Sequence, residues 1–65
     1  MSRKARFRAA LGLARMTATD FAAMNLVTPG HLSHVLSGKR DSAKLDAAID
    51  SFISRYLPAQ KEGAA

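Results

Sequence analysis

Cysteine is absent from this chain of 65 residues. Its absence excludes disulfide bonds, thiolate zinc sites and cysteine nucleophiles. No apolar run approaches the roughly 20 residues of a membrane-spanning helix. The segment ALGLA is shorter than a signal-peptide core of about 7–15 apolar residues. We therefore expect a soluble, cytoplasmic protein that has no membrane partner.

Acidic residues are also scarce, since five Asp and Glu stand against ten Lys and Arg, for a net charge of +5. The imbalance is local: residues 1–15 carry five cations and no acid, Lys39 and Arg40 form a second basic point, and residues 41–57 are slightly acidic. Such asymmetry predicts that one side of the molecule meets an anionic partner, which could be nucleic acid, an anionic membrane or an acidic protein.

Apolar residues make up 48% of the chain, as in an ordinary folded domain. A domain of this size buries only about 60% of the surface that its unfolded chain exposes, so its stability is marginal and dimerisation would add to it. We expect residues 1–58 to form a single domain and residues 59–65 to form a flexible tail.

The spacing of apolar residues predicts an all-α bundle of four, or five, short helices and no strand. The first expected helix covers Lys4–Ala14. The second covers Ala18–Asn25, where Thr17 and Asp20 have the spacing of a capping box. Asn25 tolerates a left-handed backbone, so we expect it to end this helix.

Two further helices have clear start and stop signals. The third covers Pro29–Ser37, with Thr28 as N-cap, proline at the first position and Gly38 as the stop. The fourth follows Asp41-Ser42 and runs to about Leu57, before Pro58. It has the most regular apolar stripe in the chain.

The third helix has an unusual outer face. At about 100° per residue, Leu32, Val35 and Leu36 share its core side. The opposite side carries small, uncharged polar groups, which favours a surface that approaches a partner closely. Lys39 and Arg40 follow directly after the helix.

Two histidines on this helix, His31 and His34, do not predict a metal site. Zinc normally takes at least three protein ligands, and no carboxylate stands near them in a ligand-like motif. Catalysis needs a nucleophile, a base and an orienting group in a cleft, for which a chain this short leaves little room. We expect no metal, no cofactor, no small-molecule ligand and no catalytic residue. The histidines are then either exposed without a role or contacts to a partner.

The segment MTATDFAAMNLVTPGHLSHVLSGKR resembles the helix-turn-helix of the phage repressor and Cro-like (XRE) family. The matching residues are Phe21-Ala22, Val27-Thr28, Leu32-Ser33, Val35 and Gly38-Lys39-Arg40. Departures from the family pattern are Leu26 at its turn glycine, Ala18 at its common glutamine, Leu36 at its usual glutamate, and Pro29-Gly30 where long base-reading side chains often occur. The resemblance covers about residues 10–55.

The resemblance implies a DNA-binding protein whose third helix enters the major groove. Groove geometry and hydrogen-bonding chemistry agree with it, because the groove admits a helix whose first turns read base edges. The expected base contacts are Pro29, Gly30, Ser33, His34 and Ser37. The expected phosphate contacts are Arg15, Thr17, Thr19, Thr28, His31, Lys39 and Arg40. The Arg3–Arg8 cluster could be a disordered basic end or a segment that lies along the phosphates.

The fourth helix carries more apolar surface than three short helices need to cover. We therefore expect a homodimer interface at Phe52, Ile53 and Tyr56. The predicted function is a sequence-specific transcriptional regulator, as a homodimeric repressor or autoregulator at a palindromic operator. The resemblance implies a phage, plasmid or other mobile-element source. The alternative is a helix-turn-helix module that binds another regulator without binding DNA.

Overall fold

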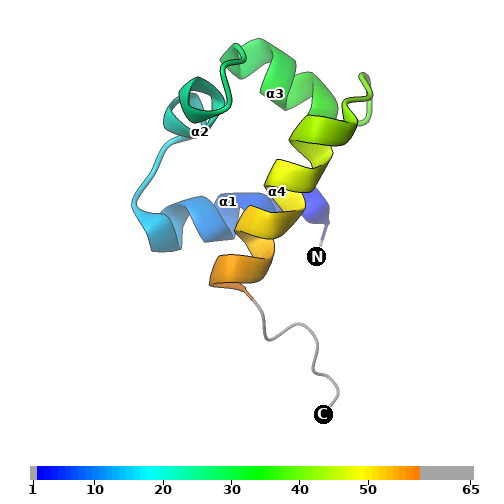
Figure 1. Cartoon of the computed structure of the whole chain (residues 1–65). Coiled ribbons are helices and arrows are strands. Elements are labelled where there is room, and N and C mark those ends of the chain that lie inside the picture. Colours follow the sequence, from blue (N-terminus) through cyan, green and yellow to red (C-terminus); the bar gives the residue numbers. More distant parts are fainter. Residues whose placement is uncertain (1, 58–65) are drawn as a thin grey trace.

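The computed structural model describes residues 2–57, in which every regular element is a helix, so the all-α prediction is confirmed. Two helices, α2 and α3, are joined by a short turn and pack on one another, while α1 and α4 cross beneath them (Figure 1). The predicted domain end at residue 58 and the predicted tail at 59–65 lie outside the described residues. The four helices are α1 (Arg3–Ala14), α2 (Ala18–Met24), α3 (Pro29–Leu36) and α4 (Ala43–Tyr56).

Each helix begins where a side-chain hydroxyl accepts a hydrogen bond from an amide of the first turn. Those amides have no partner within the helix, so a Ser or Thr cap fixes the start. The capping box of α2 is complete, because the Asp20 carboxylate also accepts from the Thr17 amide at 3.1 Å. The other three caps are Ser2, Thr28 and Ser42, with hydroxyl–amide distances of 3.1 to 3.2 Å.

Three helices end on a residue with a left-handed backbone: Arg15 at φ 57°, Leu26 at φ 57° and Gly38 at φ 82°. The assignment of this conformation to Asn25 is wrong, because Asn25 has φ −102° and its amide side chain donates to the Phe21 carbonyl at 2.9 Å. The Leu26 and Val27 amides then bond the Ala23 and Ala22 carbonyls at 3.1 and 3.0 Å, which completes a Schellman motif.

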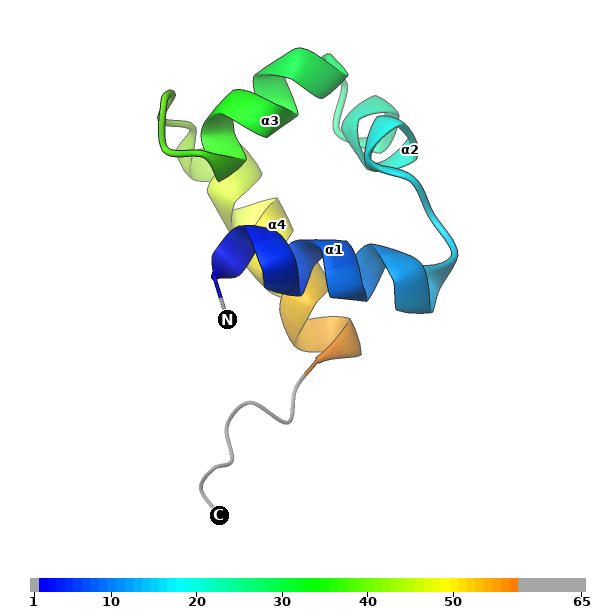
Figure 2. The ribbon, with the colours of Figure 1, turned by 180° about the vertical axis from the view of Figure 1, so that it is seen from behind.

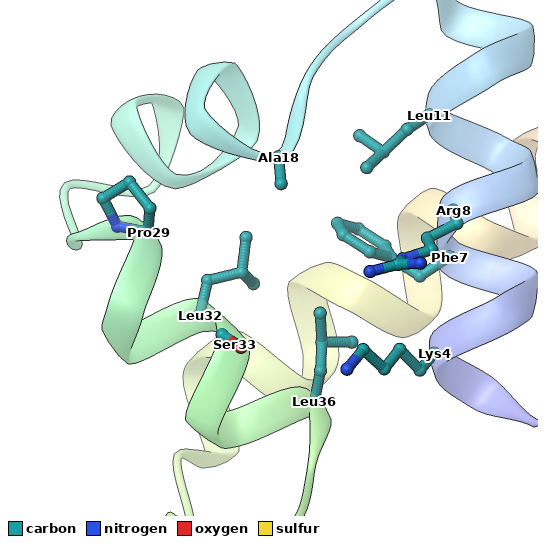
Figure 3. Close-up of a pocket in the computed structure, with 9 residues that line it drawn as sticks. All are labelled: Lys4, Phe7, Arg8, Leu11, Ala18, Pro29, Leu32, Ser33 and Leu36. Atoms are coloured by element: carbon teal, nitrogen blue, oxygen red, sulfur yellow. The ribbon is translucent and has the colours of Figure 1, made fainter.

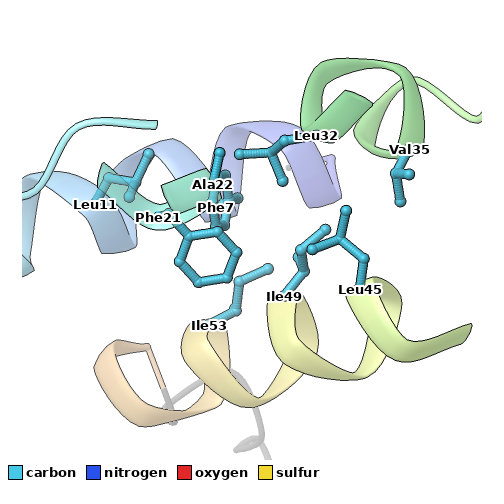
Figure 4. Packing of buried hydrophobic residues seen from close by; sticks show 9 residues of the cluster. All are labelled: Phe7, Leu11, Phe21, Ala22, Leu32, Val35, Leu45, Ile49 and Ile53. Carbon is cyan, nitrogen blue, oxygen red and sulfur yellow. The ribbon is translucent and has the colours of Figure 1, made fainter. Parts of the chain in front are cut away.

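All four helices contribute to one apolar core. Its buried residues are Phe7, Leu11, Phe21, Ala22, Leu32, Val35, Leu45, Ile49 and Ile53 (Figure 4). The rings of Phe7 and Phe21 meet edge to face with centroids 4.9 Å apart, and Phe52 lies 5.0 Å from Phe21. The edge-to-face arrangement is favourable because the positive edge of one ring meets the negative face of the other.

The prediction of Ile53 as a dimer contact is wrong. Ile53 is only 2% exposed, because it continues the i, i+4 row of Leu45 and Ile49 into the core. Figure 2 shows α1 lying across α4, which covers this stripe within one chain. Phe52 and Tyr56 remain half-buried, with ring centroids 5.0 Å apart.

The basic N-terminal segment is an ordered helix and not a disordered end. Arg3 ties it to the rest of the fold. Its guanidinium donates to Asp46 Oδ1 on α4 at 2.9 Å and to the Val35 carbonyl on α3 at 3.2 Å, and Asp50 Oδ1 lies 3.8 Å away. Arg3 is therefore used inside the molecule, although the sequence grouped it with the other cations of the segment.

Candidate nucleic-acid interface

The helix α3 is anchored by Leu32 and Val35, which are each 1% exposed. Because these two residues face the core, the opposite side of the helix faces outward. All five residues predicted as base contacts are exposed: Pro29, Gly30, Ser33, His34 and Ser37. At about 100° per residue, Pro29 falls only about 60° from Leu32 and borders the core side, so the other four carry the outer face. None of the five is charged or longer than histidine, so the face is shallow and rich in hydrogen-bonding groups.

Ser37 differs slightly from its predicted place. The helix ends at Leu36, and Ser37 is its C-cap. The Ser37 hydroxyl donates to the Ser33 carbonyl at 3.0 Å. Its single proton is thus engaged within the helix, and the oxygen is left to accept a hydrogen bond from a partner.

A hollow of about 320 Å³ lies along one edge of the outer face, lined by Thr28, Gly30, His31, His34 and Arg40. The chain reversal after α3 places Arg40 there. Gly38 takes the left-handed conformation, and the amides of Lys39 and Arg40 both bond the His34 carbonyl, at 2.8 and 3.3 Å. The structure therefore brings a cation, two imidazoles and a helix start to one place.

The remaining residues predicted as phosphate contacts are exposed but are distributed more widely. Arg15, Thr17 and Thr19 surround the start of α2, whereas Lys39 follows α3. The Thr17 and Thr28 oxygens already accept hydrogen bonds as helix caps, so their hydroxyl protons remain to donate. The hollow at the start of α3 therefore includes Thr28, His31 and Arg40 but is not lined by Arg15, Thr17, Thr19 or Lys39.

The sequence did not single out Lys4 and Arg8 from the Arg3–Arg8 cluster, for which contact with phosphates was one of two predicted alternatives. Lys4 and Arg8 line a second hollow, of about 110 Å³, together with Pro29 and Ser33 of α3 (Figure 3). The signal was available, because residues four apart lie on one side of a helix. The floor of this hollow is apolar and includes Leu36, which is half-buried rather than fully in the core.

Two observations on residues 2–57 concern metal sites and membrane-spanning helices. No three His, Asp or Glu side chains gather there in an arrangement that could hold a metal ion. No helix in this range is long and apolar enough to cross a membrane.

Comparison with known proteins adds no relative, because no protein-family model, curated protein or solved structure matches the chain. The resemblance to the phage repressor family therefore stays a prediction from the residues.

Proposed function

We propose that this chain is a sequence-specific DNA-binding transcriptional regulator of the cytoplasm, acting at the nucleoid, in which α3 enters the major groove. One observation carries the proposal: the outer face of α3 has no long or acidic side chain, and Arg40 lies at its edge. The groove is about 12 Å wide and admits a helix only if nothing on that face repels or obstructs the bases.

Gly30 supports a close approach to DNA. It lies in the first turn of α3, and a Cβ built there would meet no atom within 4 Å. Packing therefore does not require glycine, although glycine within a helix costs up to about 1 kcal/mol relative to alanine. A partner that must come within contact distance of the backbone explains why no side chain stands there.

His34 and Ser33 would read base edges, because both can donate and accept hydrogen bonds. Lys39, Arg40 and Arg15 would bind phosphates, which supplies affinity and little sequence information. The amide groups at the start of α3 could also bind phosphate, since a helix N-terminus attracts anions.

The regulator would act as a homodimer. Phe52 and Tyr56 are half-buried, and Phe52 shares an open hollow with Met24, whose side chain is 69% exposed. A two-fold axis through this edge of α4 would present two copies of α3, which an operator with half-sites about 34 Å apart would accept. The chain would then repress by occupying its operator, or regulate its own gene.

The second candidate is a module that binds another regulator and not DNA. Its support is the exposure of Leu13, Met24 and Leu26, at 60%, 69% and 89%. Large exposed apolar side chains are enriched where proteins dock. The basic groups around α3, however, favour DNA over a protein partner.

Selection of bound duplexes from a random pool tests the proposal. We expect enrichment of one sequence with two related half-sites whose centres lie about 10 base pairs apart. A pool that stays random through repeated rounds would contradict sequence-specific binding and favour the interaction module.

A further inference from the structure

Two cations on one side of α1 reach toward α3. Lys4 and Arg8 are both exposed, and Figure 3 shows their side chains extending across the hollow that separates the two helices. Pro29 and Ser33, two of the predicted base contacts on α3, line the same hollow. The two cations thus share a surface with the start of the helix proposed to enter the groove.

Lys4 and Arg8 differ from the neighbouring Arg3 in their partners. Arg3 makes an ion pair with Asp46, 2.9 Å away. Within residues 2–57, the ion pairs to Asp all come from Arg3, so Lys4 and Arg8 have no carboxylate within 4 Å. Both are therefore left to meet an external anion.

The hollow itself does not fit a small-molecule effector. Its volume of about 110 Å³ is well below the roughly 300–1,000 Å³ of typical ligand pockets. Its floor is formed by apolar side chains of the core, including Phe7 and Leu32, and the cationic groups stand at its rim. Long basic side chains commonly cover apolar surface with their stems and keep their charge in water. The rim, and not the cavity, is the part that can bind.

We propose that α1 forms a second phosphate-binding element, in which Lys4 and Arg8 contact the DNA backbone strand that borders the groove entered by α3. The inference rests on the proposed function. It assigns the surface between α1 and α3 to a polyanion by charge complementarity, and it extends the interface beyond the helix-turn-helix. Because backbone contacts are independent of sequence, Lys4 and Arg8 would contribute equally on any duplex.

Salt titrations of binding to a random-sequence duplex test the inference. Arg8→Gln and Lys4→Gln keep a polar side chain and remove the charge. Each should reduce the steepness of the plot of log affinity against log salt by about 2, because each protomer of the proposed dimer loses one phosphate contact. Lys44→Gln is the matched control, because Lys44 is an exposed cation at the start of α4 that lines a different hollow, away from both α1 and the proposed dimer surface. Sedimentation must show that every variant has the mass of the wild type under the assay conditions.

Equal slopes for Arg8→Gln, Lys44→Gln and the wild type would overturn the inference and leave the proposed function intact. A wild type that binds no duplex would instead overturn the proposed function. Acetylation of the unmodified protein gives a second measurement that requires no variant. DNA should protect Lys4 more strongly than Lys44, which is exposed at the start of α4. If DNA lowered the acetylation rates of the two lysines by the same factor, a contact at α1 would be contradicted.

Discussion

Leu26 holds a left-handed backbone, at φ 57°, while its side chain is 89% exposed. A residue with a Cβ is strained there by roughly 1–2 kcal/mol, whereas glycine is not. Leu26→Gly should therefore raise the free energy of unfolding by about 0.5–1 kcal/mol, after the greater freedom of glycine in the unfolded chain is subtracted. Chemical denaturation measures this change.

The control for Leu26 is Leu13→Gly, the same substitution at an exposed position within α1. There the backbone is helical, so glycine should lower stability by about 1 kcal/mol. If both substitutions destabilise the protein, the Leu26 backbone is not strained as described.

A substitution at Gly30 should change the free energy of unfolding and the affinity for DNA in opposite directions. Gly30→Ala should raise stability by up to about 1 kcal/mol, because the added methyl group meets no atom and alanine favours a helix. It should nevertheless weaken binding to the selected operator, since the methyl group would hold α3 away from the bases.

Gly12→Ala is the matched control for Gly30→Ala, since a Cβ at this position of α1 also meets nothing within 4 Å. It should raise stability and leave operator affinity unchanged. Equal operator affinities for the two alanine variants, compared by fluorescence anisotropy, would remove Gly30 from the interface.

Single residues also show which features of the helix-turn-helix segment could be predicted from the sequence and which could not. The start of α3 was predictable, because Thr28 and Pro29 fix it through local hydrogen bonding and backbone geometry. The left-handed residue of the preceding turn was not predictable by propensity. Propensity favours Asn25, but the Schellman bonds place the conformation one residue later. The backbone hydrogen bonds of the turn thus overrode the preference of the residue type.

At the scale of elements, Arg3 links α1 to both α3 and α4 through one guanidinium. Arg3→Gln should lower stability by about 1 kcal/mol, because a partly exposed ion pair and a hydrogen bond to a carbonyl are lost together. Its DNA salt slope should match that of the wild type.

Arg8→Gln, one helical turn and one residue further along α1, should show the reverse: unchanged thermal stability and a smaller salt slope. The two variants remove the same charge from the same helix. If Arg3→Gln changed the slope and Arg8→Gln did not, the two arginines would have been assigned to the wrong roles.

For the helices too, features set by the local sequence could be predicted, whereas features set by contacts between distant segments could not. The apolar periodicity of α4 could be predicted from the sequence. The part of its apolar stripe that another helix covers could not. Ile53 was expected at a dimer surface because the apolar stripe of α4 was judged wider than three short helices need to cover. The crossing of α1 over α4 depends on contacts far apart in sequence, such as that of Arg3 with Asp46, and it places Ile53 inside. For the same reason the partner of Arg3 was not predictable.

For the whole molecule, the proposed dimer should depend on Tyr56. The ring of Tyr56 is half-buried against Phe52 at the end of α4, and a tyrosine suits an interface because its ring can be buried while its hydroxyl stays in water. Tyr56→Ala should reduce the mass measured by sedimentation from that of a dimer toward that of a monomer. Leu13→Ala, at another exposed apolar site, should leave the mass unchanged. Identical masses for wild type and Tyr56→Ala would contradict this interface.

The overall charge supports a polyanionic partner, and the salt dependence of DNA binding tests that claim most directly. Two protomers that each bring Arg15, Lys39 and Arg40 to phosphates make six contacts. On a random duplex, the slope of log affinity against log salt should therefore be about −5 or more negative. The same titration with a duplex from the selection should show tighter binding at every salt concentration. Absence of binding to either duplex at low salt would contradict the account.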